Sequence, residues 1–510
     1  MAQQHLVSKT DYLLYRECPK NTWLKLHKPD VYYRGELSAF ELSIIETGNE
    51  VEAEARKLFP TGILIEGRDE AARERTADLI AEAQKNDAAA SLFQPVFLRD
   101  RFLAAVDVLT YDPAKKSWTI YEIKASNAIK EKLHLYDLAF QVALVRKAGL
   151  TVGGINLLHL NPDYIRDGAL DLIKLFVADD VSEAVNAMLP EVEAEMKEAQ
   201  DYLFSGTEPS GPCTCIYKGR SAHCTTFSYS NPQVPEYSVH DIARIGVSKA
   251  KLTELIDSSI YTLDQIPESM ALSEIQANQV STYISKRPIV RLDKIAGELN
   301  SLVYPLYFLD YETFPCAIPR FSGYSPYQQI PFQYSLHVAE SADDTDPAHF
   351  EFLHEGTDDP GPALAASLMK HIGKIGTVIV WNKKFEQGRN EEIARRLPHT
   401  RGFFDDLNGR VYDLMDIFTK QYHVHQDFYG STSIKYVLPV LVPELSYKNL
   451  DIREGGTASQ KWNEMTTGKT VEGTLLTSAE RAVIATNLKA YCKLDTYAMY
   501  AIWKHLIDSL

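Results

Sequence analysis

The sequence is poor in cysteine, and it has no long apolar run. Six cysteines among 510 residues do not make the disulfide framework of a small secreted protein. The N-terminal segment lacks the apolar core of a signal peptide, and no apolar run is long enough to span a membrane. We therefore expect a cytoplasmic protein without a membrane partner.

Basic residues are outnumbered as well. The 53 Lys and Arg against 69 Asp and Glu give a formal net charge of −16. A general nucleic-acid coat protein would be basic, so this class is excluded. A nuclease remains compatible, because bound cations neutralise acidic metal sites and a basic groove can lie on an acidic body. The length exceeds that of one hydrophobic core and predicts two or three domains.

Two apolar, β-rich runs, 102–111 and 118–125, are joined by an Asp-Pro turn and predict a β-hairpin. Asp107 lies in the first predicted strand. Glu122 and Lys124 are two positions apart in the second, so they share a face. Carboxylates suit Mg²⁺ or Mn²⁺, and an ammonium group can orient water or offset charge in the transition state. The alternative is an ordinary hairpin with a surface ion pair.

The segment 131–148 after the hairpin has helical spacing and carries Gln141. This arrangement resembles the RecB-type branch of the PD-(D/E)XK nucleases, which also carry a glutamine on the following helix. The resemblance implies two metal-binding side chains, one backbone metal ligand, a catalytic lysine and a supporting glutamine: Asp107, Glu122, the Ile123 carbonyl, Lys124 and Gln141.

An acidic helix is predicted over 38–58. RecB-type nucleases often place a further metal ligand, His or Glu, on such a helix. Its glutamates are Glu46, Glu50, Glu52 and Glu54. A solvated acidic face is the alternative, and we prefer it for most of them.

Four cysteines bracket the predicted nuclease domain, one near its start and three near its end: Cys18, Cys213, Cys215 and Cys224. This distribution resembles the iron–sulfur branch of RecB-type nucleases and implies a 4Fe-4S cluster. Four thiolates suit zinc equally well, and free thiols in loops are a further alternative. The remaining two, Cys316 and Cys492, are expected to be packing residues.

Short helices separated by turns are predicted between residues 231 and 303. We interpret this segment as a helical connector. A nucleic-acid backbone contact is the alternative, through Lys249, Lys251, Lys286, Arg287 and Arg291. A later segment, 429–462, mixes Tyr, Lys and Gly, and could line a single-strand channel or form a long loop and a helix.

A second acidic pattern begins on a predicted strand that ends in Asp310-Tyr311-Glu312. Further strands are predicted over 332–338 and 377–381. Glu386 then lies at a helix start and Asp413 follows another apolar run. Near the C-terminus, Tyr491 and Asp495 lie one helical turn apart.

This order resembles the tyrosine-bearing DEDD exonucleases of the ribonuclease H-like fold. The resemblance implies two metal ions held by Asp310, Glu312, Glu386 and Asp495, with Asp413 as the alternative middle acid. Tyr491 would orient the attacking water. The competing interpretation is a scaffold whose acids are only surface charge, although unpaired charge at the ends of buried strands is costly.

Together these patterns predict an α/β protein with a PD-(D/E)XK nuclease domain (1–230), a helical connector (231–303) and a ribonuclease H-like exonuclease domain (304–510). The module order resembles a family of uncharacterised bacterial and archaeal proteins. We expect a metal-dependent nuclease acting on DNA or RNA that is single-stranded or has free ends. A nucleic-acid-binding or assembly subunit with one or both sites inert is the alternative.

Overall fold

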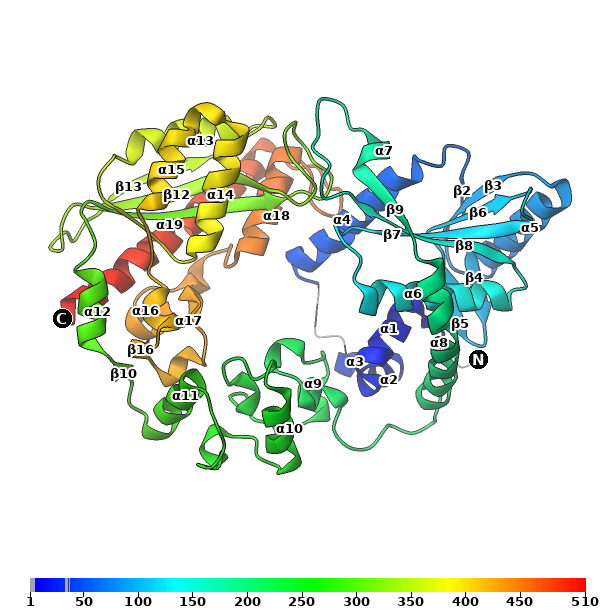
Figure 1. Cartoon of the computed structure of the whole chain (residues 1–510), viewed down its shortest axis with the longest axis horizontal. Coiled ribbons are helices and arrows are strands. Elements are labelled where there is room, and N and C mark those ends of the chain that lie inside the picture. Colours follow the sequence, from blue (N-terminus) through cyan, green and yellow to red (C-terminus); the bar gives the residue numbers. More distant parts are fainter. Residues whose placement is uncertain (1–4, 33–34, 36) are drawn as a thin grey trace. The chain divides into compact units, whose positions relative to one another are not determined.

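The computed structural model describes residues 5–32, 35 and 37–510. The chain is a mixed α/β protein that forms two compact units, coloured along the sequence in Figure 1. The first unit comprises Met1–Glu36, Ile44–Gln233 and Ala317–Tyr327, and the second comprises Leu37–Ser43, Val234–Cys316 and Gln328–Leu510. Within the described ranges, no helix has both the length and the apolar character needed to cross a membrane.

A six-stranded sheet is the centre of the first unit, with strand order β2-β3-β6-β7-β8-β9. Its strands are β2 (Ile63–Leu64), β3 (Ala90–Phe93), β6 (Val108–Asp112), β7 (Ser117–Lys124), β8 (Val152–Leu160) and β9 (Phe176–Asp180). β6 and β7 pair antiparallel. This confirms the part of the predicted hairpin that is next to its turn. β7 and β8 pair parallel, with α6 (Glu131–Lys147) between them in sequence.

The first predicted strand, 102–111, is wrong as a single element. It is divided into β5 (Phe102–Ala105) and β6, and β5 belongs to a separate three-stranded sheet with β4 (Val96–Arg99) and β1 (Val7–Ser8). Asp107 therefore lies in the break between two strands. Both pieces are buried, so the run of apolar residues does not reveal where the chain passes from one sheet to the other.

Side chains alternate between the two faces of β7, as the strand period requires. Trp118 and Ile120 belong to a core that also contains residues of α6, α5 (Glu70–Asn86) and α8 (Ser182–Leu203). Ile123 belongs to another core on the opposite face, with residues of α4 (Ala39–Arg56). The side chains of Glu122 and Lys124 lie on the same face of β7 as those of Trp118 and Ile120, the face that α6 covers. They therefore lie beside the polar residues of that helix.

The start of the first unit is helical: α1 (Lys9–Glu17), α2 (Pro19–His27) and α3 (Pro29–Tyr32). Ser8 and Asp11 form a capping box that begins α1 at Lys9. Cys18 ends α1 and begins α2. Near the end of the unit lie α7 (Leu172–Leu175), α9 (Phe227–Ser230) and the short 3₁₀ helices Thr214–Tyr217 and Arg220–Ala222.

The second unit contains a five-stranded sheet with order β13-β12-β11-β14-β15. The strands are β11 (Leu306–Pro315), β12 (Gln329–Ala339), β13 (Ala348–Leu353), β14 (Thr377–Val380) and β15 (Val411–Asp413). β12 runs antiparallel to both of its neighbours, whereas β14 and β15 run parallel to β11. The three strands predicted here are confirmed.

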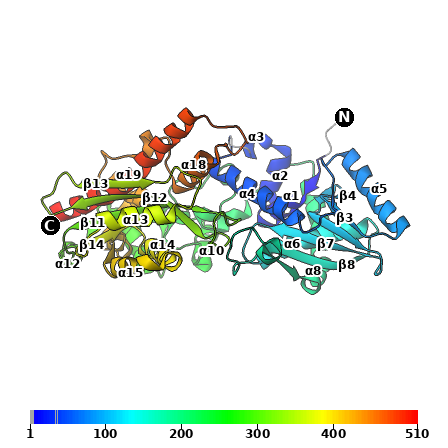
Figure 2. The ribbon, with the colours of Figure 1, turned by 90° about the horizontal axis from the view of Figure 1, so that it is seen from above.

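Helices cover both faces of this sheet, as Figure 2 shows. Tyr307, Leu309 and Tyr311 of β11 pack in a core with residues of α13 (Gly361–His371), α14 (Lys383–Arg396) and α15 (Arg401–Gly409). Phe308 points to the other face, where its ring lies 5.7 Å from that of Trp503 in α19 (Ser478–Asp508). By the same alternation, the even-numbered acids of β11 lie on the α19 side.

The predicted connector packs with the second unit and is not a unit of its own. It contains α10 (Lys249–Asp257), α11 (Glu274–Ser285) and α12 (Leu292–Leu299), and its strand β10 (Ile289–Val290) pairs with β16 (His423–Val424). The predicted loop at 429–462 contains two helices, α17 (Ile434–Leu441) and α18 (Gly455–Thr467). A short helix, α16 (Asp416–Thr419), precedes β16.

Candidate functional site

Glu122 is the centre of the first candidate site. It is 1% exposed, and its Oε1 accepts hydrogen bonds from the ammonium groups of Lys9 and Lys124, each at 2.7 Å. Its Oε2 accepts from Nε2 of Gln141 at 2.7 Å. Burial alone would favour the protonated acid, but the two ammonium groups hold the pKa of Glu122 well below its usual range. Glu122 is therefore a carboxylate with both oxygens engaged.

Asp137 completes this cluster and was not predicted. It lies on α6 one turn before Gln141, whose Nε2 donates to Asp137 Oδ1 at 2.9 Å. Lys124 donates to Asp137 Oδ2 at 2.5 Å. Burial would lower the pKa of Lys124, but Glu122 and Asp137 outweigh burial and raise that pKa. The i,i+4 spacing of Asp137 and Gln141 was a sequence signal for a shared helix face.

Asp107 occupies the break between β5 and β6, where its side chain bonds to backbone. Its Oδ2 accepts from the N–H of Ile123 at 2.8 Å, and its Oδ1 accepts from Gln94 at 3.1 Å. Gln94 also donates to Glu52, so the acidic helix α4 does contribute one glutamate to this region. Burial, followed by the charge of Glu122, raises the pKa of Asp107 to about 7.

The four predicted cysteines lie together. Their sulfur atoms are all within 4.8 Å of one another, and the distances from Cys224 Sγ to Cys18 Sγ and to Cys213 Sγ are both 3.8 Å. Cys213 Sγ also accepts a hydrogen bond from Asn231 at 3.2 Å. Contacts among the sulfurs lower the pKa of Cys18 and raise that of Cys215. The donor set fits a thiolate-bound metal.

The donor set does not separate the two expected metal groups. Four thiolates suit zinc and an iron–sulfur cluster alike.

The second candidate site begins with Asp310 and Glu312 on β11. Their carboxylates lie on the α19 face and, with the Cys492 sulfur, offer three ligand atoms within 4.8 Å of one another. The pairing of β11 with β12 shifts register after Glu312, which marks a bulge or irregularity beside the site. Burial is the main cause of the raised pKa of Asp310, and Asp495 adds to it. Cys492 was expected only to fill space, and instead it faces these acids.

Asp495 comes to this site from α19. Its Oδ1 accepts from the hydroxyl of Tyr447 at 2.6 Å, and its buried Oδ2 has no hydrogen-bond partner among the described residues. Burial raises its pKa to about 6. Tyr491 lies one turn earlier, with its ring centroid 6.2 Å from that of Tyr447. Tyr447 was not predicted, because nothing in the sequence around it links it to Asp495.

Glu386 and Asp413, the two candidates for the middle acid, differ in their partners. Glu386 lies in the first turn of α14, and its buried Oε2 has no partner within the described part of the chain. Burial and the charge of Asp310 raise its pKa. Asp413 accepts backbone N–H groups with both oxygens, from Lys383 at 2.9 Å and Met415 at 3.1 Å. Glu386 therefore has an oxygen free for a metal, whereas Asp413 holds the start of α14.

Two cations act on these acids, and burial outweighs both. Lys435 acts to lower the pKa of Glu312 and Asp495, and Arg389 acts to lower that of Glu386. All four acids have a raised pKa, and two of them, Glu386 and Asp495, have a carboxylate oxygen without a hydrogen-bond partner among the described residues. Divalent cations bind such carboxylate oxygens. The residues present therefore fit a metal site.

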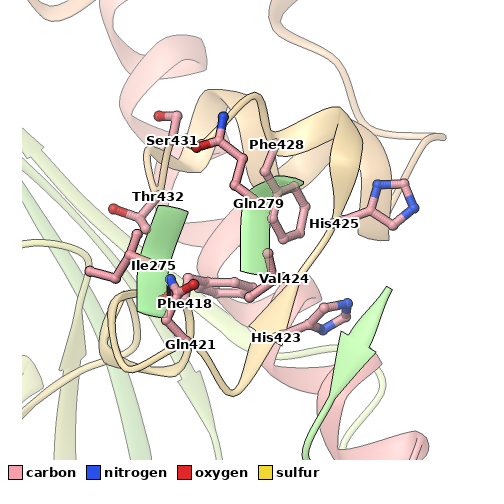
Figure 3. Close-up of a pocket in the computed structure, with 11 residues that line it drawn as sticks. Ile275, Gln279, Phe418, Gln421, His423, Val424, His425, Phe428, Ser431 and Thr432 are labelled. Carbon is pink, nitrogen blue, oxygen red and sulfur yellow. Dashed lines mark hydrogen bonds between the residues drawn. The ribbon is translucent and has the colours of Figure 1, made fainter. Parts of the chain in front are cut away.

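A small cavity of about 20 Å³ lies elsewhere in the second unit, between α11 and the segment around β16 (Figure 3). It has room for about one water molecule. His423 lines it, and its buried Nδ1 has no hydrogen-bond partner in the described residues. Burial lowers the pKa of His423 to about 4, so the imidazole is neutral. None of the predicted metal ligands lines this cavity.

Comparison with known proteins gives two similarities. The chain is similar to an uncharacterized protein, MG366, of Mycoplasma genitalium, with 25% identity over 272 residues. The match covers 48% of this chain and 39% of that protein, so the chain spans about two fifths of the length of this curated relative. Residues 307–433 match a domain of unknown function, DUF2779. The stretch that carries Asp310, Glu312 and Glu386 is thus similar to a domain whose function is not assigned.

Proposed function

We propose that this chain is a metal-dependent nuclease with two phosphodiester-cleaving sites, one in each unit. The observation that carries the proposal is the convergence of four acids in the second unit, three of them buried and Asp310 partly buried: Asp310, Glu312, Glu386 and Asp495. Leaving such charges unpaired in a protein interior is costly, and divalent cations would remove that cost. The strand order, with β12 alone antiparallel to the rest, supports the resemblance to the ribonuclease H-like fold.

In the second site these carboxylates would hold two ions, Mg²⁺ or Mn²⁺. Bound there, the ions would supply the charge that activates water and offsets the negative charge of the phosphate. Tyr447 holds Asp495 by one oxygen and leaves the other for a ligand. Burial raises the pKa of Tyr491, so at neutral pH its hydroxyl keeps its proton and can donate to the attacking water.

In the first site Asp107 and Glu122 would bind the cation, and Lys124 would hold the water or the phosphate oxygen. Gln141 and Asp137 orient the lysine and the glutamate through the hydrogen bonds described above. Metal binding must compete with Lys9 for Glu122, because the ammonium group of Lys9 lies 2.7 Å from Oε1. The four-cysteine centre would stabilise the same unit by joining its first helices to the segment at 213–224.

A nucleic-acid-binding or assembly role with an inert first site is the second candidate. The hydrogen bonds of Glu122 favour it. Both carboxylate oxygens already accept hydrogen bonds, from Lys9, Lys124 and Gln141, which leaves less room for a metal ion. In that case the chain would bind nucleic acid at the first unit and cleave it only at the second.

The test uses single-stranded DNA and RNA labelled at either end, with Mg²⁺ or Mn²⁺. We expect Asp310→Ala to abolish stepwise nucleotide release and Lys124→Ala to abolish a separate cleavage activity. Asp406→Ala is the matched control, because this aspartate of the second unit is half-exposed and pairs with Arg410. No metal-dependent cleavage of any substrate would refute the nuclease. Unchanged products with Lys124→Ala in the Asp310→Ala background would refute the first site alone.

A further inference from the structure

The second acidic site contains a donor that a site for hard cations does not need. Cys492 is fully buried on α19, and its Sγ lies 4.0 Å from Asp310 Oδ2. Together with Glu312, these residues place one sulfur and two carboxylate ligand atoms within 4.8 Å of one another. Carboxylates alone suit Mg²⁺ and Mn²⁺, whereas a thiolate favours softer transition metals.

The distance between Cys492 and Asp310 is close to that of two ligands of one ion. Zn²⁺ binds sulfur at about 2.3 Å and carboxylate oxygen at about 2.1 Å, so the two atoms lie about 3.6 Å apart at a tetrahedral angle. The observed 4.0 Å differs from this by a few tenths of an ångström. The Glu312 ligand atom lies within 4.8 Å of both.

An independent observation also indicates a ligand here. Asp495 and Glu386 are 8% and 3% exposed, and each has an oxygen without a hydrogen-bond partner among the described residues. The charges of Asp495 and Asp310 act on one another, as do those of Glu386 and Asp310. The unpartnered acids therefore lie close enough to Asp310 to feel its charge, beside the three residues that include Cys492.

We infer that this site binds a thiophilic divalent cation of the zinc class through Cys492, Asp310 and Glu312. Binding exchanges the thiol proton for the metal and releases that proton to solvent. A thiolate and two carboxylates leave a fourth position for water, Asp495 or Glu386. Three protein ligands hold Zn²⁺ more tightly than the carboxylates hold Mg²⁺. Zn²⁺ would consequently displace Mg²⁺ and inhibit cleavage at this site, a consequence that rests on the proposed nuclease function.

The binding test uses Co²⁺ and Zn²⁺ on the full chain with its four-cysteine centre already loaded and its metal content measured. We expect one additional Co²⁺ per chain, with sulfur-to-metal charge-transfer absorption in the near ultraviolet. Cys492→Ser should remove this absorption and weaken Zn²⁺ binding about a hundredfold, the upper range for loss of supporting residues around a metal. Its Mn²⁺ affinity should change less than about threefold, because the carboxylates remain.

Cys316→Ser is the matched control, since Cys316 is a buried cysteine of the same unit outside the cluster. It should leave the Co²⁺ spectrum unchanged. If Cys492→Ser does not fold, Asp310→Asn is used instead. It removes the charge of a carboxylate ligand and should also weaken Zn²⁺ binding. Absence of the sulfur absorption in wild type, or its persistence in Cys492→Ser, would overturn the inference. Mg²⁺-dependent cleavage is measured separately, without Zn²⁺. Cleavage without the sulfur absorption would refute the thiolate site and leave the proposed nuclease function standing.

Discussion

Asp495 makes the stability of the second unit depend on pH in a way that one substitution isolates. Its pKa is about 6 in the fold against an ordinary value of 3.8, because burial disfavours the charged form. The folded state therefore binds more protons than the unfolded state between these two values. The sign follows: the stabilisation from this group is full below pH 3.8 and is lost as the pH rises through 6.

The magnitude follows from the two pKa values. The difference of about 2.2 pKa units at about 1.36 kcal/mol each gives about 3 kcal/mol over the whole titration, of which about 2.4 kcal/mol is lost between pH 4 and pH 7. The wild-type curve alone does not show this loss. Burial lowers the pKa of His337 to about 3 and of His349 to about 4, so these groups add stability as the pH rises. The informative quantity is the difference between wild type and Asp495→Asn.

We expect Asp495→Asn to gain about 2.4 kcal/mol in unfolding free energy relative to wild type as the pH rises from 4 to 7 without divalent ions. Asn keeps an oxygen that can accept from Tyr447, so the packing is preserved. The assay is denaturant or calorimetric unfolding of the full chain. Leu336→Ala shows which unfolding transition belongs to the second unit. It truncates a fully buried side chain there and should lower the unfolding free energy of that transition by about 2–5 kcal/mol.

Divalent cations provide the internal control. Mg²⁺ or Mn²⁺ at about 100 times its Kd should stabilise wild type by about 2.7 kcal/mol. The Asn variant, which lacks one carboxylate, should gain much less. A difference curve that stays flat between pH 4 and pH 7 would refute the reasoning, because it would show that Asp495 titrates alike in the folded and unfolded states.

Three further outcomes are expected. Glu122→Ala should remove the Lys124-dependent cleavage in the Asp310→Ala background and destabilise the first unit by about 1–3 kcal/mol, as seen by unfolding, because Lys9 and Lys124 lose one of their two acidic partners and keep only Asp137. Tyr491→Phe should slow nucleotide release about a hundredfold or more in single-turnover assays while metal content is unchanged, since only water orientation is lost. Cys213→Ser should lower bound zinc or iron in elemental analysis and destabilise the first unit; unchanged metal and stability would contradict a four-cysteine centre.

Local patterns were sufficient to predict the elements that carry the acids. The alternation of Asp310 and Glu312 around Tyr311 placed both carboxylates on one face, and the structure has that strand and that face. The helical spacing after the hairpin likewise placed Gln141 on α6. In each case the signal and its consequence lie within one strand or one helix, where the backbone period fixes direction.

Residues that come from distant parts of the chain were not predictable in this way. Lys9 reaches Glu122 across 113 positions, and Tyr447 reaches Asp495 across 48. Neither pair has a sequence spacing that links it, because the contact depends on how separate elements pack. Cys492 is fully buried, as expected of a packing residue, but its place beside the acids was not predictable, because only the position of α19 over β11 brings it to Asp310.

The two acidic sites differ in how their charge is compensated, and this predicts different dependence on cations. In the first unit, Lys9 and Lys124 lie against Glu122 and Asp137, so the cluster is largely neutral before any ion binds. In the second unit, four acids have raised pKa values, and the nearby cations Lys435 and Arg389 do not prevent it. A bound cation would lower these pKa values and favour the carboxylate forms. Removal of divalent ions should accordingly alter the second unit more than the first.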